Sequence, residues 1–158
     1  MATIHNVTMK IPDGVAANCL NSPERMVWLE SLPNVVEELG RRWQLTTDAP
    51  LSGEEPSCSY VEAVRRADGT SAVLKVSMPH MEQEYEIDGL RFWSGDPTVR
   101  LLESDDELGA MLLERCRPGT TLRNLEECEQ DVVISGLLRR LWRSPPRPHR
   151  FRDRKSVV

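Results

Sequence analysis

The sequence predicts an α+β fold, in which a five-stranded antiparallel sheet carries one helix between its third and fourth strands. Two changes of period lead to this prediction. Residues 45–77 have the two-residue alternation of strands, residues 79–93 have the period of a helix, and residues 98–116 return to strands. With 158 residues, 39% of them apolar, the chain is long enough to bury one core.

Two helices are expected before the sheet. Residues 22–24 (Ser-Pro-Glu) predict a helix start, because serine is a good N-cap, proline fits the first helical position and an acid suits the first turn. This helix is expected to end near Ser31, and the second to begin at Leu32-Pro33. The second helix has an apolar stripe formed by Val36, Leu39 and Trp43. A short strand is also expected around residues 7–11.

The predicted sheet begins at Leu45. Asp68-Gly69 predicts a tight turn between the second and third strands, since this pair accepts the positive φ of a hairpin. The helix that follows is expected to open at Pro79 and to close near Gly95. In chain order, the predicted elements are strands 45–52, 60–66 and 71–77, helix 79–93, strands 98–105 and 108–116, and helix 126–142, whose apolar face carries Ile134, Leu137, Leu138 and Leu141.

These elements divide the chain into four predicted regions. They are a helical extension (1–44), the sheet domain (45–116), a linker with a first helix of a further lobe (117–142) and a basic Pro/Arg-rich tail (143–158).

Charge is distributed unevenly along the chain. The net charge is −5, yet residues 143–158 hold six basic side chains and one acidic one, which leaves 14 basic and 24 acidic side chains in the rest. An acidic body repels nucleic-acid phosphates. We therefore expect no nucleic-acid partner, and the alternative of RNA binding depends on the tail alone.

The remaining composition indicates a soluble protein of the cytoplasm. No apolar run approaches the ~20 residues of a membrane span, and the N-terminus lacks a signal-peptide core. The four cysteines and three histidines are scattered without metal-ligand spacing, so neither a zinc site nor a disulfide framework is expected.

A lysine and a glutamate occupy the positions that ATP binding requires in a kinase N-lobe. Lys75 lies on the third predicted strand and Glu86 on the following helix. A lysine that contacts the α- and β-phosphates needs a carboxylate partner to hold it. Glu86 is preferred over Glu82, one turn earlier, because Glu86, Leu90 and Trp93 share a helix face.

Further candidate residues lie around this pair. Val73 shares a strand face with Lys75 and would pack on adenine. The loop between the first two strands would cover the phosphates, although it lacks the G-x-G-x-x-G pattern. After the fifth strand, Glu114 and Cys116 point the same way and suit a linker that contacts adenine through its backbone. The candidate loop residues are Gly53, Ser57 and Ser59.

The chain resembles the aminoglycoside phosphotransferases, in particular the group of streptomycin 6-kinases and hydroxyurea phosphotransferases. The resemblance covers roughly residues 10–150 and is strongest in VRRADGTSAVLKVSMPHMEQEYEIDGLRFW and VRLLESDDELGAMLLERCRPGTTL, with support from LPNVVEELGRRWQL and ISGLLRRLW. It implies a kinase-like N-terminal lobe and transfer of the ATP γ-phosphate, with Mg²⁺, to an alcohol group of an aminoglycoside or hydroxyurea. Lys75, Glu86 and residues 114–116 match the family's phosphate lysine, its helix partner and the adenine linker.

The sequence also departs from this family. Its catalytic aspartate lies in a His-Gly-Asp loop and a later aspartate binds Mg²⁺, both in a second lobe, and no histidine here precedes Gly-Asp. We therefore expect no catalytic or metal-binding residue in this chain, an acceptor site in the absent lobe, and no activity by the chain alone. A frameshifted or shortened gene, or a deliberately cut protein, would explain this. The alternative is a non-catalytic nucleotide-binding fragment, or a gene product without activity.

Overall fold

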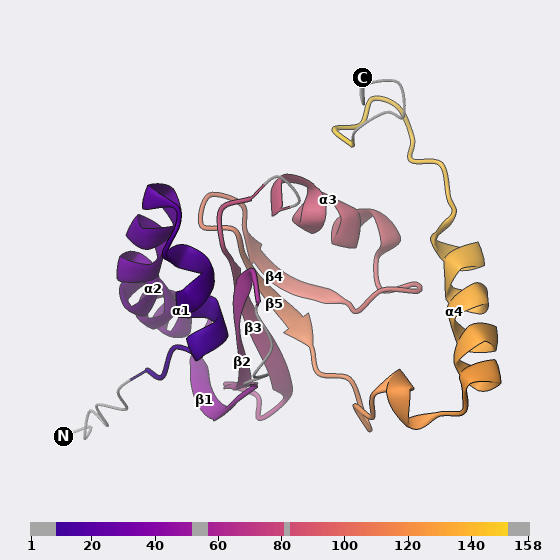
Figure 1. The fold of residues 1–158 in the computed structure, drawn as a ribbon, viewed down its shortest axis with the longest axis horizontal. Helices are drawn as coiled ribbons and strands as arrows, with labels where there is room; N and C mark the ends of the chain where they lie inside the picture. Colours follow the sequence, from indigo (N-terminus) through magenta and orange to yellow (C-terminus); the bar gives the residue numbers. More distant parts are fainter. Residues whose placement is uncertain (1–8, 52–56, 81–82, 152–158) are drawn as a thin grey trace.

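The fold is a five-stranded sheet with helices on both sides (Figure 1). The computed structural model describes residues 9–51, 57–80 and 83–151. The strands lie in the order β1-β2-β3-β5-β4, and every neighbouring pair is antiparallel. The predicted α+β class and the antiparallel sheet are confirmed. The strands are β1 (Leu45–Pro50), β2 (Ser59–Arg66), β3 (Ser71–Ser77), β4 (Leu101–Asp105) and β5 (Ala110–Glu114).

The hairpin between β2 and β3 contains the predicted Asp-Gly turn. Gly69 has φ +82°, a conformation that costs little only without a Cβ. The Asp68 carboxylate accepts a 2.9 Å hydrogen bond from the backbone N–H of Thr70, and the Arg66 N–H donates to the Thr70 carbonyl at 2.9 Å. The turn sets the register in which Val61 lies opposite Lys75.

Two helices precede the sheet, but not with the predicted bounds. They are α1 (Asp13–Cys19) and α2 (Pro23–Arg42). The Ser22 N-cap is confirmed, since its hydroxyl accepts from the Arg25 N–H at 3.4 Å. The expected break at Pro33 was wrong, as was the expected strand in its described part, residues 9–11.

Burial on both sides of Pro33 accounts for the continuous helix. An internal proline costs about 3 kcal/mol. Leu32 and Leu39, which flank it, are 0% exposed and pack in the main core, and burying two leucine side chains contributes about 3–6 kcal/mol. The α1 helix gave no comparable signal, because it has only seven residues and no side-chain cap.

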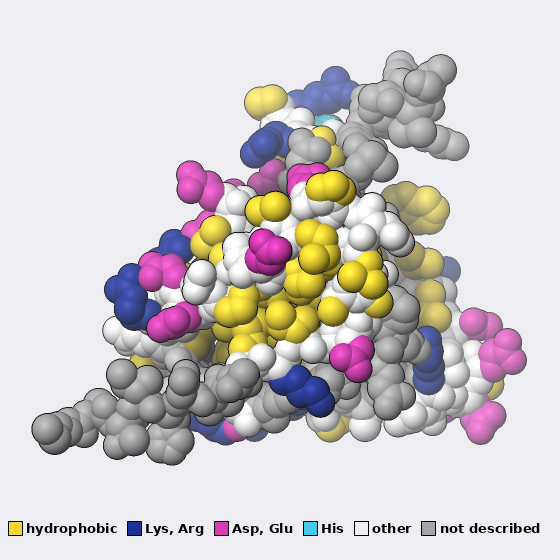
Figure 2. Space-filling model, turned by 60° about the vertical axis from the view of Figure 1, so that its left-hand side comes forward, with side chains coloured by type: hydrophobic (Ala, Val, Ile, Leu, Met, Phe, Trp, Pro, Cys, Tyr) yellow, Lys and Arg dark blue, Asp and Glu magenta, His cyan; other side chains and the backbone are white. Residues whose placement is uncertain are grey.

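The main core lies between α2 and one face of the sheet. It contains Leu32 and Leu39 with alternate residues of β2 and β3, among them Tyr60, Leu74 and Val76. Apolar side chains gather in a patch on the face that Figure 2 shows. Leu20, just after α1, and Val27 of α2 are 70% and 67% exposed.

One carboxyl group is buried in this part of the sheet. Glu62 of β2 is only 7% exposed. Burial raises the pKa of its carboxyl, while hydrogen bonds from the Tyr60 and Thr47 side chains act in the opposite direction. Burial also raises the pKa of the Tyr60 hydroxyl, and the Glu62 carboxyl adds to this shift. Glu62 is therefore a buried acid whose charged form is disfavoured by burial and favoured by the neighbouring hydroxyl groups.

The other side of the sheet carries α3 (Gln83–Trp93), with α4 (Glu127–Leu141) beyond it (Figure 1). The helix was predicted from Pro79, but residues 79–80 lie outside it, and its described part is Gln83–Trp93. The α4 helix has no buried residue. Of its predicted apolar face, Ile134 and Leu138 are 42% and 53% exposed, whereas Leu137 and Leu141 are half-buried.

The cysteines and the lengths of the helices bear on two further features predicted from the sequence. All four cysteines are free thiols, so no disulfide forms among them. Within the described ranges, no helix is both long and apolar enough to cross a bilayer.

Candidate functional site

The strand β3 presents its two faces to different surroundings. Ala72, Leu74 and Val76 lie in the core under α2 and are 0–1% exposed. Because side chains alternate along a strand, Val73 and Lys75 lie on the opposite face, where α3 and the two cavities described below are found. The alternation of β3 therefore places both candidate residues on the same side of the sheet.

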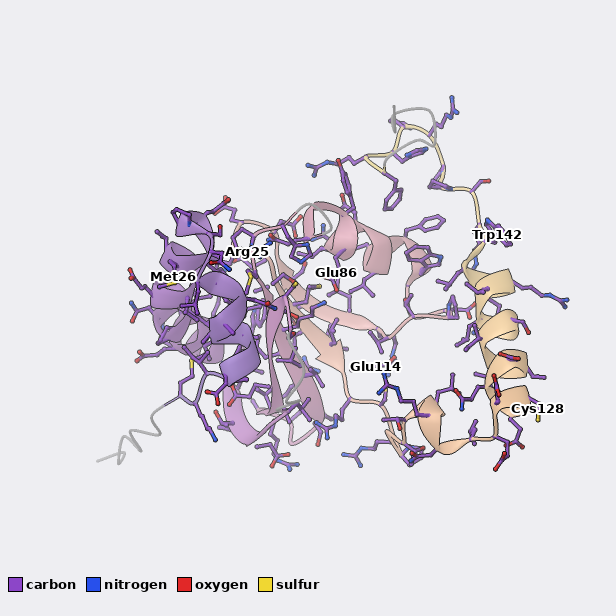
Figure 3. All side chains as sticks on the ribbon, viewed as in Figure 1. Arg25, Met26, Glu86, Glu114, Cys128 and Trp142 are labelled. Atoms are coloured by element: carbon purple, nitrogen blue, oxygen red, sulfur yellow. The ribbon has the colours of Figure 1, made fainter. Side chains whose placement is uncertain are left out.

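Lys75 and Glu86 form an ion pair between β3 and α3. The Lys75 ammonium donates to Glu86 Oε1. The second carboxylate oxygen, Oε2, accepts a 3.3 Å hydrogen bond from the hydroxyl of Ser77. The Lys75 and Glu86 side chains are 23% and 30% exposed, so the pair is partly shielded and still open to a ligand. Glu86 is labelled on α3, above the sheet, in Figure 3.

A cavity of about 510 Å³ opens beside this pair. Lys75 and Glu86 line it together with Ser59 at the start of β2 and Trp93 at the end of α3. An ammonium and a hydroxyl at a partly buried wall are groups that bind phosphate oxygens. Its other lining residues include Cys58, His80, Tyr85 and Phe151.

A second cavity, of about 350 Å³, lies where β5 leaves the sheet. Val73, Glu114 and Cys116 line it, with Leu113 and Pro118. Apolar walls beside exposed backbone suit a flat ring such as adenine. Figure 3 labels Glu114 at the end of β5.

The Glu114 side chain is already engaged within the protein. Its carboxylate accepts from the Arg100 backbone N–H at 2.8 Å and from the Arg100 guanidinium at 2.9 Å. These two bonds hold the pKa of the Glu114 carboxyl below its usual range. The Glu114 N–H donates to the Arg100 carbonyl at 3.0 Å. Both the side chain and the backbone N–H of Glu114 are thus engaged with Arg100.

The three loop candidates have different positions. Gly53 lies outside the described residues. Ser59 lines the larger cavity, whereas the Ser57 hydroxyl is used locally, donating to the Ser59 carbonyl at 3.0 Å and accepting from the Ser59 N–H at 3.3 Å. The fallback residue Glu82 is also outside the described residues. A role in binding stays a prediction for all of these residues.

Sequence reasoning missed Ser77, the second partner of the Glu86 carboxylate, and several residues that line the larger cavity. Ser77 follows Lys75 by two positions on one strand face, so the alternation used for Val73 would also have found it. Phe151 had no such signal, because it comes from the C-terminal segment and reaches α3 only through the tertiary fold, with its ring centroid 5.8 Å from that of Phe92. No group of three or more potential metal ligands occurs within residues 9–51, 57–80 and 83–151.

The sheet and the ion pair together define a class of protein. A five-stranded antiparallel sheet whose third strand carries a lysine, paired with a glutamate of the following helix, is the arrangement of the N-terminal lobe of a kinase-like fold. A family model described as "Aminoglycoside/hydroxyurea antibiotic resistance kinase" matches residues 42–155. The chain belongs to this family. The match extends to residue 155, slightly beyond the roughly 10–150 over which the sequence shows the resemblance.

Curated relatives agree with this assignment. The chain is 43% identical over 154 residues to a streptomycin 6-kinase of Streptomyces glaucescens, covering 95% of this chain and 49% of the relative. It is 40% identical over 141 residues to the streptomycin 6-kinase of Streptomyces griseus, covering 87% of this chain and 45% of that protein. It is 40% identical over 117 residues to a hydroxyurea phosphotransferase of Kitasatospora aureofaciens, covering 72% of this chain and 34% of that protein. The chain thus spans half or less of these relatives. No solved structure gives a significant match.

Proposed function

We propose that this chain is the ATP-holding portion of a phosphotransferase that transfers the γ-phosphate of ATP to an alcohol group of a streptomycin-like aminoglycoside or of hydroxyurea. The observation that carries the proposal is the ion pair between Lys75 on β3 and Glu86 on α3. In phosphoryl transfer the protein acts mainly by positioning and by neutralising phosphate charge. Lys75 supplies that positive charge, and Glu86 holds it in place.

The two cavities suit the two ends of the nucleotide. The phosphates would lie beside Lys75 and Ser59, and the adenine ring beside Val73. The Glu114 carbonyl would accept from the exocyclic amine and the Cys116 N–H would donate to the ring. Mg²⁺ would neutralise phosphate charge when bound, and its protein ligands are expected in the half of the relatives that this chain does not match.

Titration of the chain with ATP in the presence of MgCl₂ tests the nucleotide part of this proposal. Saturable binding is expected. No binding of ATP at millimolar concentration would overturn it.

A second candidate function is a nucleotide-binding fragment without catalytic activity. It is favoured by the coverage, since the chain matches 49% of the S. glaucescens streptomycin 6-kinase. Incubation of this chain, and of a protein spanning the relatives' full length, with ATP, MgCl₂ and either streptomycin or hydroxyurea separates the two. We expect no phosphorylated product from the chain alone, and product formation would rule out the fragment interpretation. A protein spanning the relatives' full length is expected to phosphorylate one of these acceptors.

A further inference from the structure

Ser77 is a buried polar residue at the end of the strand that carries Lys75. It is the last residue of β3 and only 1% exposed. A hydroxyl group that loses its contact with water costs free energy unless it finds a protein partner. Most other positions buried to this degree in the described chain hold apolar side chains. A hydrogen bond of its hydroxyl therefore accounts for the burial of this serine.

The partner of the Ser77 hydroxyl is the carboxylate of Glu86. The hydroxyl donates to Oε2 at 3.3 Å, while the Lys75 ammonium donates to Oε1. Lys75 and Ser77 are two positions apart and share a strand face. Two side chains on one face of β3 thus bind the two oxygens of the same carboxylate. The Lys75 ammonium binds Oε1, and the neutral Ser77 hydroxyl binds Oε2.

The backbone around Ser77 is itself fixed. The Ser77 N–H donates to the Gly109 carbonyl at 3.0 Å, and the next N–H, of Met78, donates to the Cys58 carbonyl at 2.9 Å. Ser77 is held from the β4–β5 turn on one side and from the residue before β2 on the other. Its hydroxyl is therefore attached to backbone with little freedom to move.

We propose that Ser77 is a positioning residue for the phosphate-binding lysine. Its hydroxyl fixes the rotation of the Glu86 carboxylate, so that Oε1 stays on the Lys75 ammonium before a nucleotide arrives. Preorganisation of this kind strengthens binding, because the ordering cost is met when the protein folds. This role rests on the proposed function, since it concerns the same lysine.

The attachment of α3 to the sheet does not depend on Ser77. Ile87 of α3 is 7% exposed and buried against the rest of the fold. Arg91, one turn later, donates to the Ser104 hydroxyl of β4 at 2.8 Å and to Asp106 at 2.7 Å. Removal of the Ser77 hydroxyl should therefore free the carboxylate and leave the helix in place.

Lysine-selective NMR tests this directly, because the chain has three lysines, at positions 10, 75 and 155. In a ¹⁵N-lysine sample, the order parameter of the Lys75 ammonium reports how firmly it is held. We expect it to fall in Ser77→Ala and to stay unchanged in Ser104→Ala, which also removes a serine hydroxyl that bonds to α3. Ser77→Thr and Ser77→Val form a second pair of equal size that differs only in the hydroxyl. Thr should retain the ordered ammonium, and Val should lose it.

ATP titration in MgCl₂ gives the second readout. The affinity is expected to fall about two- to tenfold in Ser77→Ala and Ser77→Val, the range of one net hydrogen bond, and to be retained in Ser77→Thr and Ser104→Ala. If the wild-type chain does not bind ATP, the proposed function fails, and the ammonium order parameter still decides the role of Ser77. An unchanged Lys75 order parameter in both Ser77→Ala and Ser77→Val would overturn the inference, whatever the ATP affinity.

Discussion

The indole of Trp93 donates a 3.1 Å hydrogen bond to the backbone carbonyl of Leu141, 48 positions along the chain. This bond joins the end of α3 to the end of α4. Asp96 adds to it, since it accepts from Arg140 and, at 2.7 Å, from Arg143. Because α4 has no buried residue, these polar contacts at one end have a large share in holding the helix to the sheet.

Asp96→Ala is expected to loosen α4 while leaving the free energy of global unfolding nearly unchanged, because exposed ion pairs contribute little to stability. Hydrogen exchange should become faster along α4 and stay the same in β3. The same change in Asp131, on α4 itself, is the control and should leave the exchange of α4 as it is. Equal exchange of α4 in wild type and Asp96→Ala would contradict this account.

The same contacts should respond to pH. Hydrogen bonds from Arg140 and then Arg143 lower the pKa of the Asp96 carboxyl. For a lowered pKa, the stabilising contribution is complete above the unfolded value and is lost as the pH falls through the folded value. Exchange of α4 should thus be constant near neutral pH, once corrected for its intrinsic pH dependence, and accelerate only in strong acid. In Asp96→Ala this acceleration should be absent.

Glu62→Gln is expected to stabilise the protein at neutral pH. Burial raises the pKa of the Glu62 carboxyl, so the folded state binds more protons than the unfolded state between the two pKa values. Stability therefore decreases as the pH rises through that window, and the charged form is the destabilised one. Gln keeps a side-chain oxygen beside the Tyr60 and Thr47 hydroxyls, without the charge.

Urea unfolding at pH 7 and at pH 4 measures this effect. The midpoint of Glu62→Gln should exceed that of wild type at pH 7, and the difference should shrink at pH 4. Glu103→Gln, at an exposed position of β4, is the matched control and should show no such trend. A lower midpoint for Glu62→Gln at pH 7 would mean that the charged carboxylate stabilises the fold.

Lys75→Met should weaken ATP binding about tenfold or more, because a charge-assisted contact with phosphate is lost. Isothermal titration with ATP and MgCl₂ measures the change. Lys10→Met makes the same substitution at an exposed position outside the cavities and should bind as wild type does. An affinity that stays unchanged in Lys75→Met would remove Lys75 from the nucleotide site.

Replacing one apolar residue of α4 together with its C-cap residue should reduce self-association without a loss of stability. Leu138 is 53% and Trp142 is 90% exposed, and exposed apolar side chains promote aggregation. Light scattering of Leu138→Gln/Trp142→Gln should decrease at high protein concentration, while the urea midpoint stays unchanged. Leu74→Ala is the contrasting variant, since truncation of this buried core residue should cost about 2–5 kcal/mol. A falling midpoint in the α4 variant would show that these side chains support the fold.

Local patterns predicted the parts of this fold that local interactions determine. The alternation of β3 and the Asp68-Gly69 turn led to the hairpin, and the helix after it placed Glu86 near Lys75. The uninterrupted α2 could not be predicted in this way, because Pro33 signals a break and only the buried neighbours Leu32 and Leu39 override it. Contacts such as that of Asp96 with Arg143 depend on the tertiary path of the C-terminal segment, which no local period encodes.

The strand order β1-β2-β3-β5-β4 places β3 in the middle of the sheet, bonded to a strand on each side. An edge strand can detach while the rest of the sheet survives, but a central strand separates only when both neighbours release it. The wall that carries Lys75 should therefore belong to the last part of the molecule to open. Any adjustment to a bound ligand would then occur in side chains and in the surrounding loops and helices, with this strand as their fixed reference.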